Sequence, residues 1–372
     1  MTPSMTDTVS GVPRGFHLFS LVVVFFAILL IWKGAATTTE EAGMAFSDWP
    51  LSLGSVNPPG WLSYSAPFLE HSHRLLGTLV GTLTLLLFGW IFLSRGGRWW
   101  ELVVLVAVLA TVFGLFIAAG AERSDPDRKR LLMTVAVLSS LVPVSWLVAS
   151  WFLRRNWDFP VRLTGLALLM VTAQAILGGM RVTEISNTFA VIHGCLAQAF
   201  FCVLILIILV SSKKWETFRF SRLPASVGGF LGAFLTLLVS IQLLLGASMR
   251  HFHRTGLADD GVLRTEGRWI PAFDEPIIAV LFLHKLTAVL VALALTGSLF
   301  MTWRWRGARR HLLLIGGVVL VQIMLGVGVI HTGKSFWITN FHVLSGLAIL
   351  ALSFTFLVRG VRSPGRVEAP TG

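Results

Sequence analysis

The sequence predicts an all-α polytopic membrane protein with two pseudo-symmetric four-helix bundles and an inserted helix pair. Of its 372 residues, 55% are apolar and only 13% are charged, whereas soluble domains carry about 25% charged residues. Ten apolar runs are long enough to cross a bilayer, and the string Q-x-x-L-G occurs three times. These three observations exclude a soluble enzyme, a disordered chain and a disulfide-linked scaffold.

A spanning helix needs about 20 mostly apolar residues. Runs of this kind lie near residues 16–34, 71–93, 102–120, 131–152, 162–182, 188–210, 227–249, 277–300, 311–330 and 338–358. The first run is too long for a signal peptide and lacks a small-residue cleavage site, so we expect a helix that is retained.

The distribution of positive charge predicts the orientation of these helices. If the N-terminus is cytoplasmic, 17 of the 30 Lys and Arg residues fall in cytoplasmic segments and ten in outer loops, where acidic residues offset most of them. Positive charge gathers on the cytoplasmic side of membrane proteins. We therefore expect both termini in the cytoplasm and a multi-pass protein of the inner (cytoplasmic) membrane, in contact with the lipid bilayer. The net charge of +12 indicates orientation and not nucleic-acid binding.

An internal repeat organises the chain. Q-x-x-L-G begins at Gln174, Gln242 and Gln322, and the first and third strings are each followed, at nearly equal distance, by a histidine at the start of the next helix. Self-similarity of this kind indicates a duplicated unit. Each unit also has an earlier histidine helix, and the two histidines of the first unit lie much further apart in the chain than those of the second. That excess matches two additional helices.

The boundary between the halves falls at the basic linker from Lys213 to Leu223. We expect an N-terminal half at residues 1–212, which holds the inserted helix pair at about 95–156, and a C-terminal half at residues 213–372. Both halves begin and end inside, so an axis along the membrane normal is expected to relate them.

Four histidines occupy equivalent places in this repeat, each near the start of a helix that enters from the outer face: His73, His193, His284 and His342. A histidine inside a spanning helix is costly and by default functional. Two imidazoles on facing helices are what axial ligation of a haem iron requires. One such histidine could equally bond a loop carbonyl, but four at equivalent places favour ligands. Zinc is disfavoured because no local cluster has zinc spacing.

The two halves differ beside the first histidine of each. Glu70 stands three residues before His73, on the same helix face, whereas Leu281 stands three residues before His284. A buried carboxylate can accept or relay a proton, and it can also simply be stabilised by the helix dipole. We predict that Glu70 is catalytic, and that the first half performs chemistry while the second stores or passes electrons.

Arg74 and Lys285 directly follow His73 and His284. Each can bind a carboxylate such as a haem propionate or extend toward lipid headgroups. Gly77 and Gly81, one and two turns beyond His73, favour close helix packing over room for a flat macrocycle.

Residues 35–69 contain no Lys or Arg, a compositional break that predicts a folded lid, with Asp48-Trp49-Pro50 as its sharpest element. The histidines without a repeat partner are expected at the surface: His17, His71, His311 and His331.

Six stretches taken together resemble haem A synthase over nearly the whole chain except about 95–156. They are GAATTTEEAGMAFSDWPL, the E-x-x-H-R of Glu70, His73 and Arg74, QAILGGMRVT at 174–183, HGCLAQA at 193–199, QLLLGASMRH at 242–251 and FH at 341–342.

The resemblance implies that a methyl group of haem O is oxidised to a formyl group, giving haem A for a terminal oxidase. It implies haem O, and haem A as product, held by His73 and His193, a haem b held by His284 and His342, and Glu70 as the acid tied to activity. Haem O synthase and an electron donor are the implied partners, and a homo-oligomer is a further expectation.

The chain departs from the family pattern in three ways. Ten spanning helices are predicted where members usually have eight. The first outer loop has no cysteine pair, which argues against a thiol step. Lys285 replaces the arginine expected after the third histidine, and a lysine cannot offer a bidentate fork to a propionate.

Two other function classes remain open. A bis-histidine dihaem b-type electron-transfer protein without oxygenation chemistry would need haems at opposite membrane faces, and Glu70 would have no role in it. A repeat-built transporter would need helices broken at mid-membrane, and no Pro-interrupted pair is present.

Overall fold

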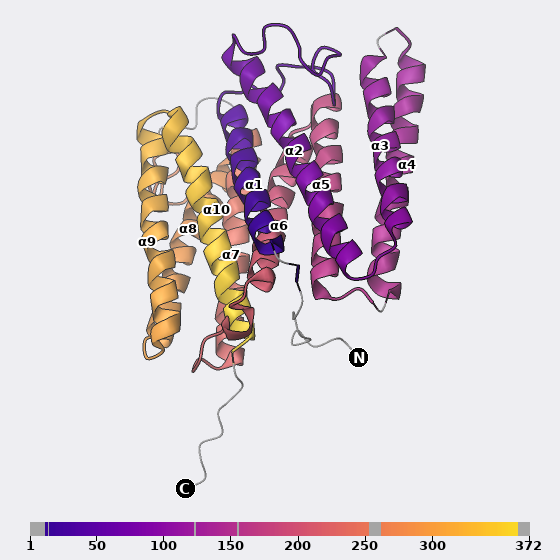
Figure 1. Ribbon diagram of the computed structural model, residues 1–372. Helices are drawn as coiled ribbons and strands as arrows, with labels where there is room; N and C mark the ends of the chain where they lie inside the picture. The colour runs from indigo at the N-terminus through magenta and orange to yellow at the C-terminus, as the bar shows by residue number, and fades with distance from the viewer. Residues whose placement is uncertain (1–11, 14, 123, 155, 253–261, 364–372) are drawn as a thin grey trace. The chain divides into compact units, whose positions relative to one another are not determined.

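The computed structural model describes residues 12–13, 15–122, 124–154, 156–252 and 262–363 (Figure 1). These ranges contain ten helices that are long and apolar enough to cross a membrane, and their only bridges are two isolated ones in loops. The helices are α1 (Phe16–Thr39), α2 (Ser65–Ser94), α3 (Trp99–Ala121), α4 (Pro126–Leu153), α5 (Phe159–Thr183), α6 (Asn187–Ser211), α7 (Ala225–Phe252), α8 (Pro276–Met301), α9 (Arg306–His331) and α10 (Phe336–Val361). The predicted all-α membrane protein is confirmed.

Several helices start where the sequence supplies a side-chain cap. The carboxylate of Asp125 accepts from the backbone N–H of Asp127 and Arg128 at α4, and Asp158 caps α5 in the same way. Ser186 caps α6 through its hydroxyl. Such caps satisfy backbone donors that have no partner within the helix.

Helix α2 begins earlier than the predicted run at 71–93, and α1 continues to Thr39. Pro67 lies in the first turn of α2, where a missing N–H costs nothing. The loop before α2 therefore comprises residues 40–64 and is shorter than the predicted lid. Glu70 and His73 are consequently residues of a helix.

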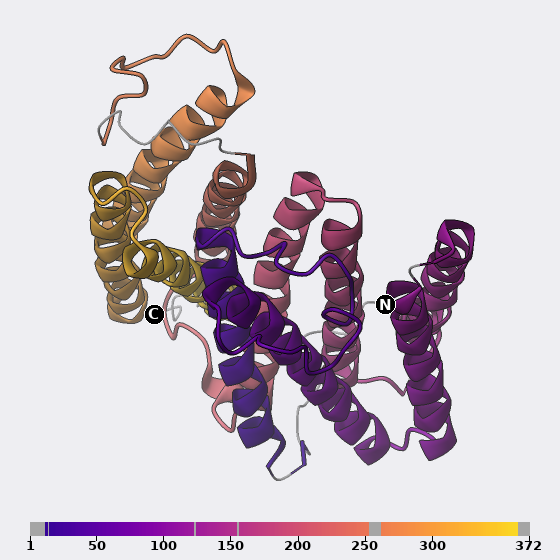
Figure 2. The same ribbon diagram turned by 90° about the horizontal axis from the view of Figure 1, so that it is seen from above.

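The chain divides into two compact units, residues 1–212 (unit 1) and 213–372 (unit 2). In unit 1, the helices α1, α2, α5 and α6 form a ring in which α2 and α6 stand on opposite sides. Helices α3 and α4 form a hairpin that packs beside α5, outside this ring (Figure 2). Unit 1 is therefore a four-helix bundle with an added hairpin.

Unit 2 repeats the ring with α7, α8, α9 and α10, and here α8 and α10 are opposite. Helices α7 and α10 approach so closely that a Cβ atom on Gly232 would overlap the backbone of Leu357. Small residues permit such backbone contact between spanning helices. In both units the two histidine-bearing helices therefore face each other across the bundle.

Candidate paired-histidine sites

The four predicted histidines have matching positions in their helices. His73 and His284 are the ninth residues of α2 and α8, while His193 and His342 are the seventh residues of α6 and α10. At 1.5 Å per residue, each lies roughly 9 to 12 Å from the start of its helix. We call this end of each bundle its histidine end.

In unit 1 the two imidazoles face each other. The ring centres of His73 and His193 are 6.5 Å apart, and the ring planes are inclined by 80°. A metal bonded to one nitrogen of each ring at about 2.0 Å would set the ring centres roughly 6 Å apart. The observed spacing therefore fits one metal ion held between the rings.

In unit 2, His284 and His342 also stand on opposite helices, and they are close enough to interact electrostatically. The same chain topology thus brings a second pair of imidazoles together, with Leu281 in the place that Glu70 has in unit 1.

Each of these rings lies against a glycine of the preceding helix. A Cβ atom at the glycine would stand 2.9 to 3.3 Å from the ring Cε1 atom, which is closer than ordinary van der Waals contact. The pairs are Gly34 with His73, Gly178 with His193, Gly246 with His284 and Gly326 with His342. The lack of a side chain at these positions is what lets the ring sit there.

Three of these glycines end the Q-x-x-L-G strings, but the fourth was missed by the sequence analysis. Gly34 ends Leu30-Ile31-Trp32-Lys33-Gly34, in which leucine replaces the glutamine. The signal that could have revealed it is a glycine near the end of every helix that precedes a histidine helix.

Hydrogen bonds orient two of the rings. Nδ1 of His193 is 3.2 Å from the carbonyl of Gln174, and Nδ1 of His342 is 3.2 Å from the carbonyl of Gln322. An Nδ1–H donated to a carbonyl leaves Nε2 as the nitrogen that can bind a metal. Nδ1 of His73 and of His284 is buried without a hydrogen bond of normal geometry to any described residue.

Glutamine side chains distinguish unit 2 from unit 1. Nε2 of Gln242 is 3.4 Å from Nε2 of His284, and Nε2 of Gln322 is 3.3 Å from Nε2 of His342. The Oε1 atom of Gln322 accepts from the hydroxyl of Ser345. In unit 1, the amide of Gln174 instead donates to the backbone carbonyl of His193 at 3.0 Å.

Glu70 and Arg74 form a buried ion pair that also binds the loop 40–64. The other carboxylate oxygen of Glu70 accepts from the backbone N–H of Phe46 at 3.0 Å. The guanidinium of Arg74 donates to the carbonyls of Phe46, Asp48 and Leu51. Both predicted site residues thus lie within a turn of His73 and hold the loop there, while their roles toward a haem stay predictions.

Lys285 occupies the matching place in unit 2, where its Nζ donates to the carbonyl of Arg264 at 2.5 Å. Leu51 and Arg264 each stand just before an antiparallel bridge, Ser52–Ser55 or Thr265–Arg268, that closes a two-residue turn. The central residues of both turns, Leu53-Gly54 and Glu266-Gly267, have positive φ, as type I′ turns require. The cation after the histidine therefore holds the same turn in both units, a role that the sequence analysis missed.

A further cation, Arg181 near the end of α5, acts electrostatically on His73, His193 and Glu70. Its guanidinium lies where a Cβ atom on Gly43 would be. No acid of the described part of the chain forms an ion pair with it within 4.0 Å. The sequence analysis did not single it out, because it lies outside the histidine motifs.

Two predictions about the remaining residues are wrong. His71 and His311 are not at the surface, because they are only 4% and 8% exposed. His71 bonds the hydroxyl of Ser52 and the carbonyl of Val56, and His311 bonds the carbonyl of Leu352. The absence of a repeat partner did not predict exposure because burial depends on which helix face turns inward.

The packing interpretation of Gly77 and Gly81 is also wrong. A Cβ atom at either position would have no described heavy atom within 4 Å. Because these glycines follow His73 at intervals of four residues, they lie on its side of α2. Open space therefore continues along α2 from the imidazole.

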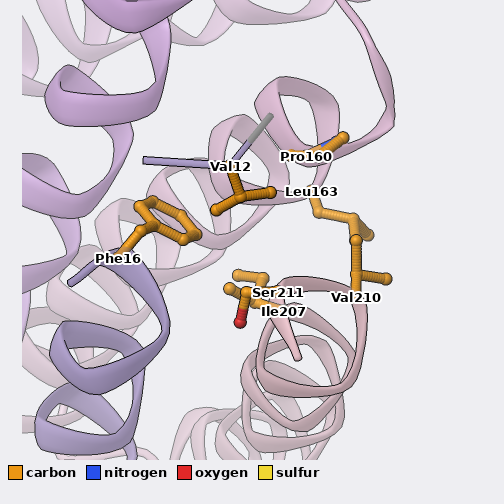
Figure 3. Close-up of a pocket in the computed structure, with 7 residues that line it drawn as sticks. All are labelled: Val12, Phe16, Pro160, Leu163, Ile207, Val210 and Ser211. Atoms are coloured by element: carbon orange, nitrogen blue, oxygen red, sulfur yellow. The ribbon is translucent and has the colours of Figure 1, made fainter. Parts of the chain in front are cut away.

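A shallow apolar recess, too small to hold a water molecule, lies elsewhere in unit 1 (Figure 3). Its lining residues are Val12, Phe16, Pro160, Leu163, Ile207, Val210 and Ser211. Phe16 and Gly34 lie near opposite ends of α1, about 27 Å apart along the helix axis. The recess is therefore distinct from the paired-histidine site.

Comparison with known proteins shows the family. The family model described as cytochrome oxidase assembly protein matches residues 129–354, more than half of the chain. The chain belongs to this family. The match begins beyond α2, inside α4, and ends inside α10, so it includes three of the four paired histidines. The resemblance noted in the sequence is confirmed at this level.

The curated relatives include proteins named "Heme A synthase". One from Rhodopseudomonas palustris (strain TIE-1) is 29% identical over 229 residues, covering 49% of this chain and 60% of the relative. Another from Bartonella tribocorum is 23% identical over 337 residues, covering 83% of this chain and 82% of the relative. The chain thus spans less than two thirds of the first relative's length.

Proposed function

We propose that this family member is a haem A synthase, which oxidises a methyl group of haem O to a formyl group. Family membership and the name of the curated relatives support this activity. The single observation that carries it is the pair His73 and His193, which face each other at 6.5 Å across the bundle of unit 1.

The residues of this pair fit an iron porphyrin. The ring spacing suits one metal ion, Nδ1 of His193 is oriented by a carbonyl, and open space follows His73 along α2. His73 and His193 would hold the iron of the substrate haem O, and His284 and His342 would hold a haem b. The bound haems supply redox-active iron.

Glu70 is the acid that can hold or move a proton at this site. It lies one turn from His73, and the equivalent residue of unit 2 is Leu281. The N–H of Phe46 in the loop 40–64 donates to the carboxylate, and the side chain is buried. Unit 1 is accordingly the half that performs the oxidation, and unit 2 passes electrons to it.

Carboxylates of the substrate would be bound by Arg181, whose charge acts on both imidazoles and which lacks an acidic partner within 4.0 Å among the described residues. Arg74 and Lys285 stay candidates for the same role. In this structure their nitrogens donate to loop carbonyls, so their contribution to haem binding would pass through the loops.

We further propose that the protein lies in the inner membrane with both termini in the cytoplasm, as the excess of cytoplasmic Lys and Arg supports. Haem O synthase and a separate electron donor are its proposed partners, and a homo-oligomer its proposed assembly.

The decisive experiment is the pigment content of the full chain purified in detergent, with redox difference spectra. Haem O or haem A beside haem b supports the proposal, haem b alone supports the electron-transfer alternative, and no haem contradicts both. The alternative is disfavoured because an odd number of spanning helices lies between each successive pair of histidine helices, three between α2 and α6 and one each between α6 and α8 and between α8 and α10. All four histidine helices therefore start from the same membrane face.

Variants test the roles separately. His193→Ala should remove the haem O and haem A signal and keep haem b. His342→Ala should remove haem b and keep bound haem O, and it should lower haem A formation because unit 2 passes the electrons. His331→Ala, an exposed histidine without a repeat partner, is the control. Glu70→Ala should retain bound haem O without forming haem A, and normal haem A formation would remove Glu70 from the mechanism.

A further inference from the structure

The inserted hairpin contacts the loop 40–64 at Trp49. Its indole lies against Phe116 of α3, with ring centres 5.0 Å apart and planes inclined by 74°. A Cβ atom at Gly179 of α5 would stand 2.6 Å from the same indole, and one at Gly120 of α3 would overlap the Trp49 carbonyl. Trp49 therefore fills a gap between the hairpin and α5.

This contact belongs to a packed apolar cluster. Its buried members are Val112 and Phe116 of α3 and Ala136 of α4, and Trp49 packs against them together with Ile176 of α5. Full burial of a large apolar side chain contributes about 1.5 to 3 kcal/mol relative to exposure to water, and Trp49 is partly buried in this cluster. The cluster therefore holds the loop by apolar contact.

The residues beside Trp49 are those that reach the histidine helix. The carbonyl of Asp48 accepts from Arg74 at 2.6 Å, and the carboxylate of Asp48 accepts from the N–H groups of Leu53 and Gly54 at 2.9 and 2.6 Å. Fixing Trp49 therefore fixes the carbonyl that Arg74 binds, and Arg74 is the ion-pair partner of Glu70.

The hairpin has its own attachment at the opposite end of the bundle. Within the hairpin, Glu101 of α3 pairs at 2.7 Å with Arg154, the C-cap residue of α4. The indole of Trp146 on α4 packs on Trp157, which in turn packs on Phe88 of α2. The hairpin is thus held to the bundle without the loop and can serve as a fixed support for it.

We infer that the α3–α4 hairpin supports the loop 40–64, and that Trp49 is the positioning residue through which it holds Arg74 and Glu70 beside His73. Unit 2 has neither the hairpin nor an acid at the position of Glu70. The effect on substrate rests on the proposed function, whereas the effect on the loop does not.

Hydrogen–deuterium exchange of the full-length protein in detergent tests the support directly. Trp49→Ala and Phe116→Ala should each accelerate exchange at the amides of Phe46, Leu53 and Gly54 by about tenfold or more, since the loop opens more often. Trp49→Phe should retain protection. Phe113→Ala removes a phenylalanine of the same helix that is 43% exposed and should change nothing.

Haem binding tests the consequence for the site. Trp49→Ala should weaken haem O binding to the His73–His193 pair by about tenfold and alter that haem's spectrum, and Trp49→Phe should restore both. The haem b signal of unit 2 should stay unchanged.

The outcomes separate the two proposals. Unchanged loop exchange in both Trp49→Ala and Phe116→Ala overturns the support, whatever haem is bound. A wild-type protein that binds no haem O overturns the proposed function, and the exchange result then decides the inference alone. Wild-type haem O binding that Trp49→Ala leaves unaltered overturns the positioning role.

Discussion

In unit 1 the loop before the first histidine helix is held by an arginine, a glutamate and a wedged tryptophan, whereas in unit 2 a lysine holds the corresponding turn. Both loops contain the same bridged turn. In both, the cation that follows the histidine donates to the carbonyl of the residue just before that turn. The bridged turn and the cation that binds it, which both units share, hold a loop to the first histidine helix of each unit. The additions of unit 1 fix a carboxylate there.

Glutamine side chains contact the histidine rings in unit 2 more than in unit 1. Unit 2 has an amide against Nε2 of each histidine, and in unit 1 one of the two glutamines is replaced by Leu30. The pair of unit 2 is thus enclosed by polar side chains, while the pair of unit 1 has an acid nearby.

The largest expected effect comes from filling the glycine behind one ring. Gly178→Val should displace His193, because a Cβ atom there already stands 3.3 Å from the ring. We expect haem binding in unit 1 to fall by about 10- to 100-fold, as for other changes that misorient a metal ligand. Pigment extraction and redox spectra measure this.

Gly246→Val should have the reciprocal effect in unit 2, and Gly114→Ala on α3, where a Cβ atom also has open space, should have none. Equal losses from both units after a single substitution would show that the two sites are not independent.

The next effect distinguishes the two cations. Arg74→Ala leaves the buried carboxylate of Glu70 without its partner, which should lower the free energy of unfolding by about 3 kcal/mol. Lys285→Ala removes the exposed hydrogen bond to the carbonyl of Arg264, whose loss should cost about 1 kcal/mol or less. Denaturant unfolding in detergent measures both, and similar costs would contradict the contrast between the loops.

A smaller effect is expected for Gln322→Leu, which removes one of the two acceptors of the Ser345 hydroxyl and leaves the carbonyl of His342 at 3.1 Å. The cost should be about 1 kcal/mol in unfolding free energy, and the midpoint potential of the unit 2 haem should shift while the spectrum of unit 1 stays constant. Redox titration measures the shift. A changed unit 1 spectrum would contradict the assignment of this glutamine to unit 2.

The smallest effect concerns the turn that the units share. Gly54→Ala and Gly267→Ala place a side chain at φ of 72° and 69°, which costs about 1 kcal/mol each. Thermal unfolding should show nearly equal losses. A loss confined to one unit would indicate that the two turns are not equivalent.

Much of the fold could be predicted because a bilayer imposes simple requirements on sequence. A span needs length and apolarity, so all ten helices were visible, although the start of α2 was not, since its first turns are polar. The repeat identified the four histidines because they recur at nearly constant spacing. The candidate acid Glu70 was visible as the one difference between the repeats.

Contacts between distant segments were not predictable in this way. Nothing in the local sequence around Arg74 or Lys285 indicates that each reaches a carbonyl in the loop that precedes its helix. Which helix faces meet likewise decides three other contacts: the burial of His71, the contact of Gly34 with His73 and the packing of Trp49 on Phe116.

The sequence by itself determined the number of spans, their order and the histidine positions, since hydrophobic length and repeat spacing are written along the chain. Only the tertiary structure decided what holds each loop and what lies behind each ring. Those contacts arise when helices far apart in the chain pack face to face, and their partners are selected by shape and by the need to satisfy buried polar groups.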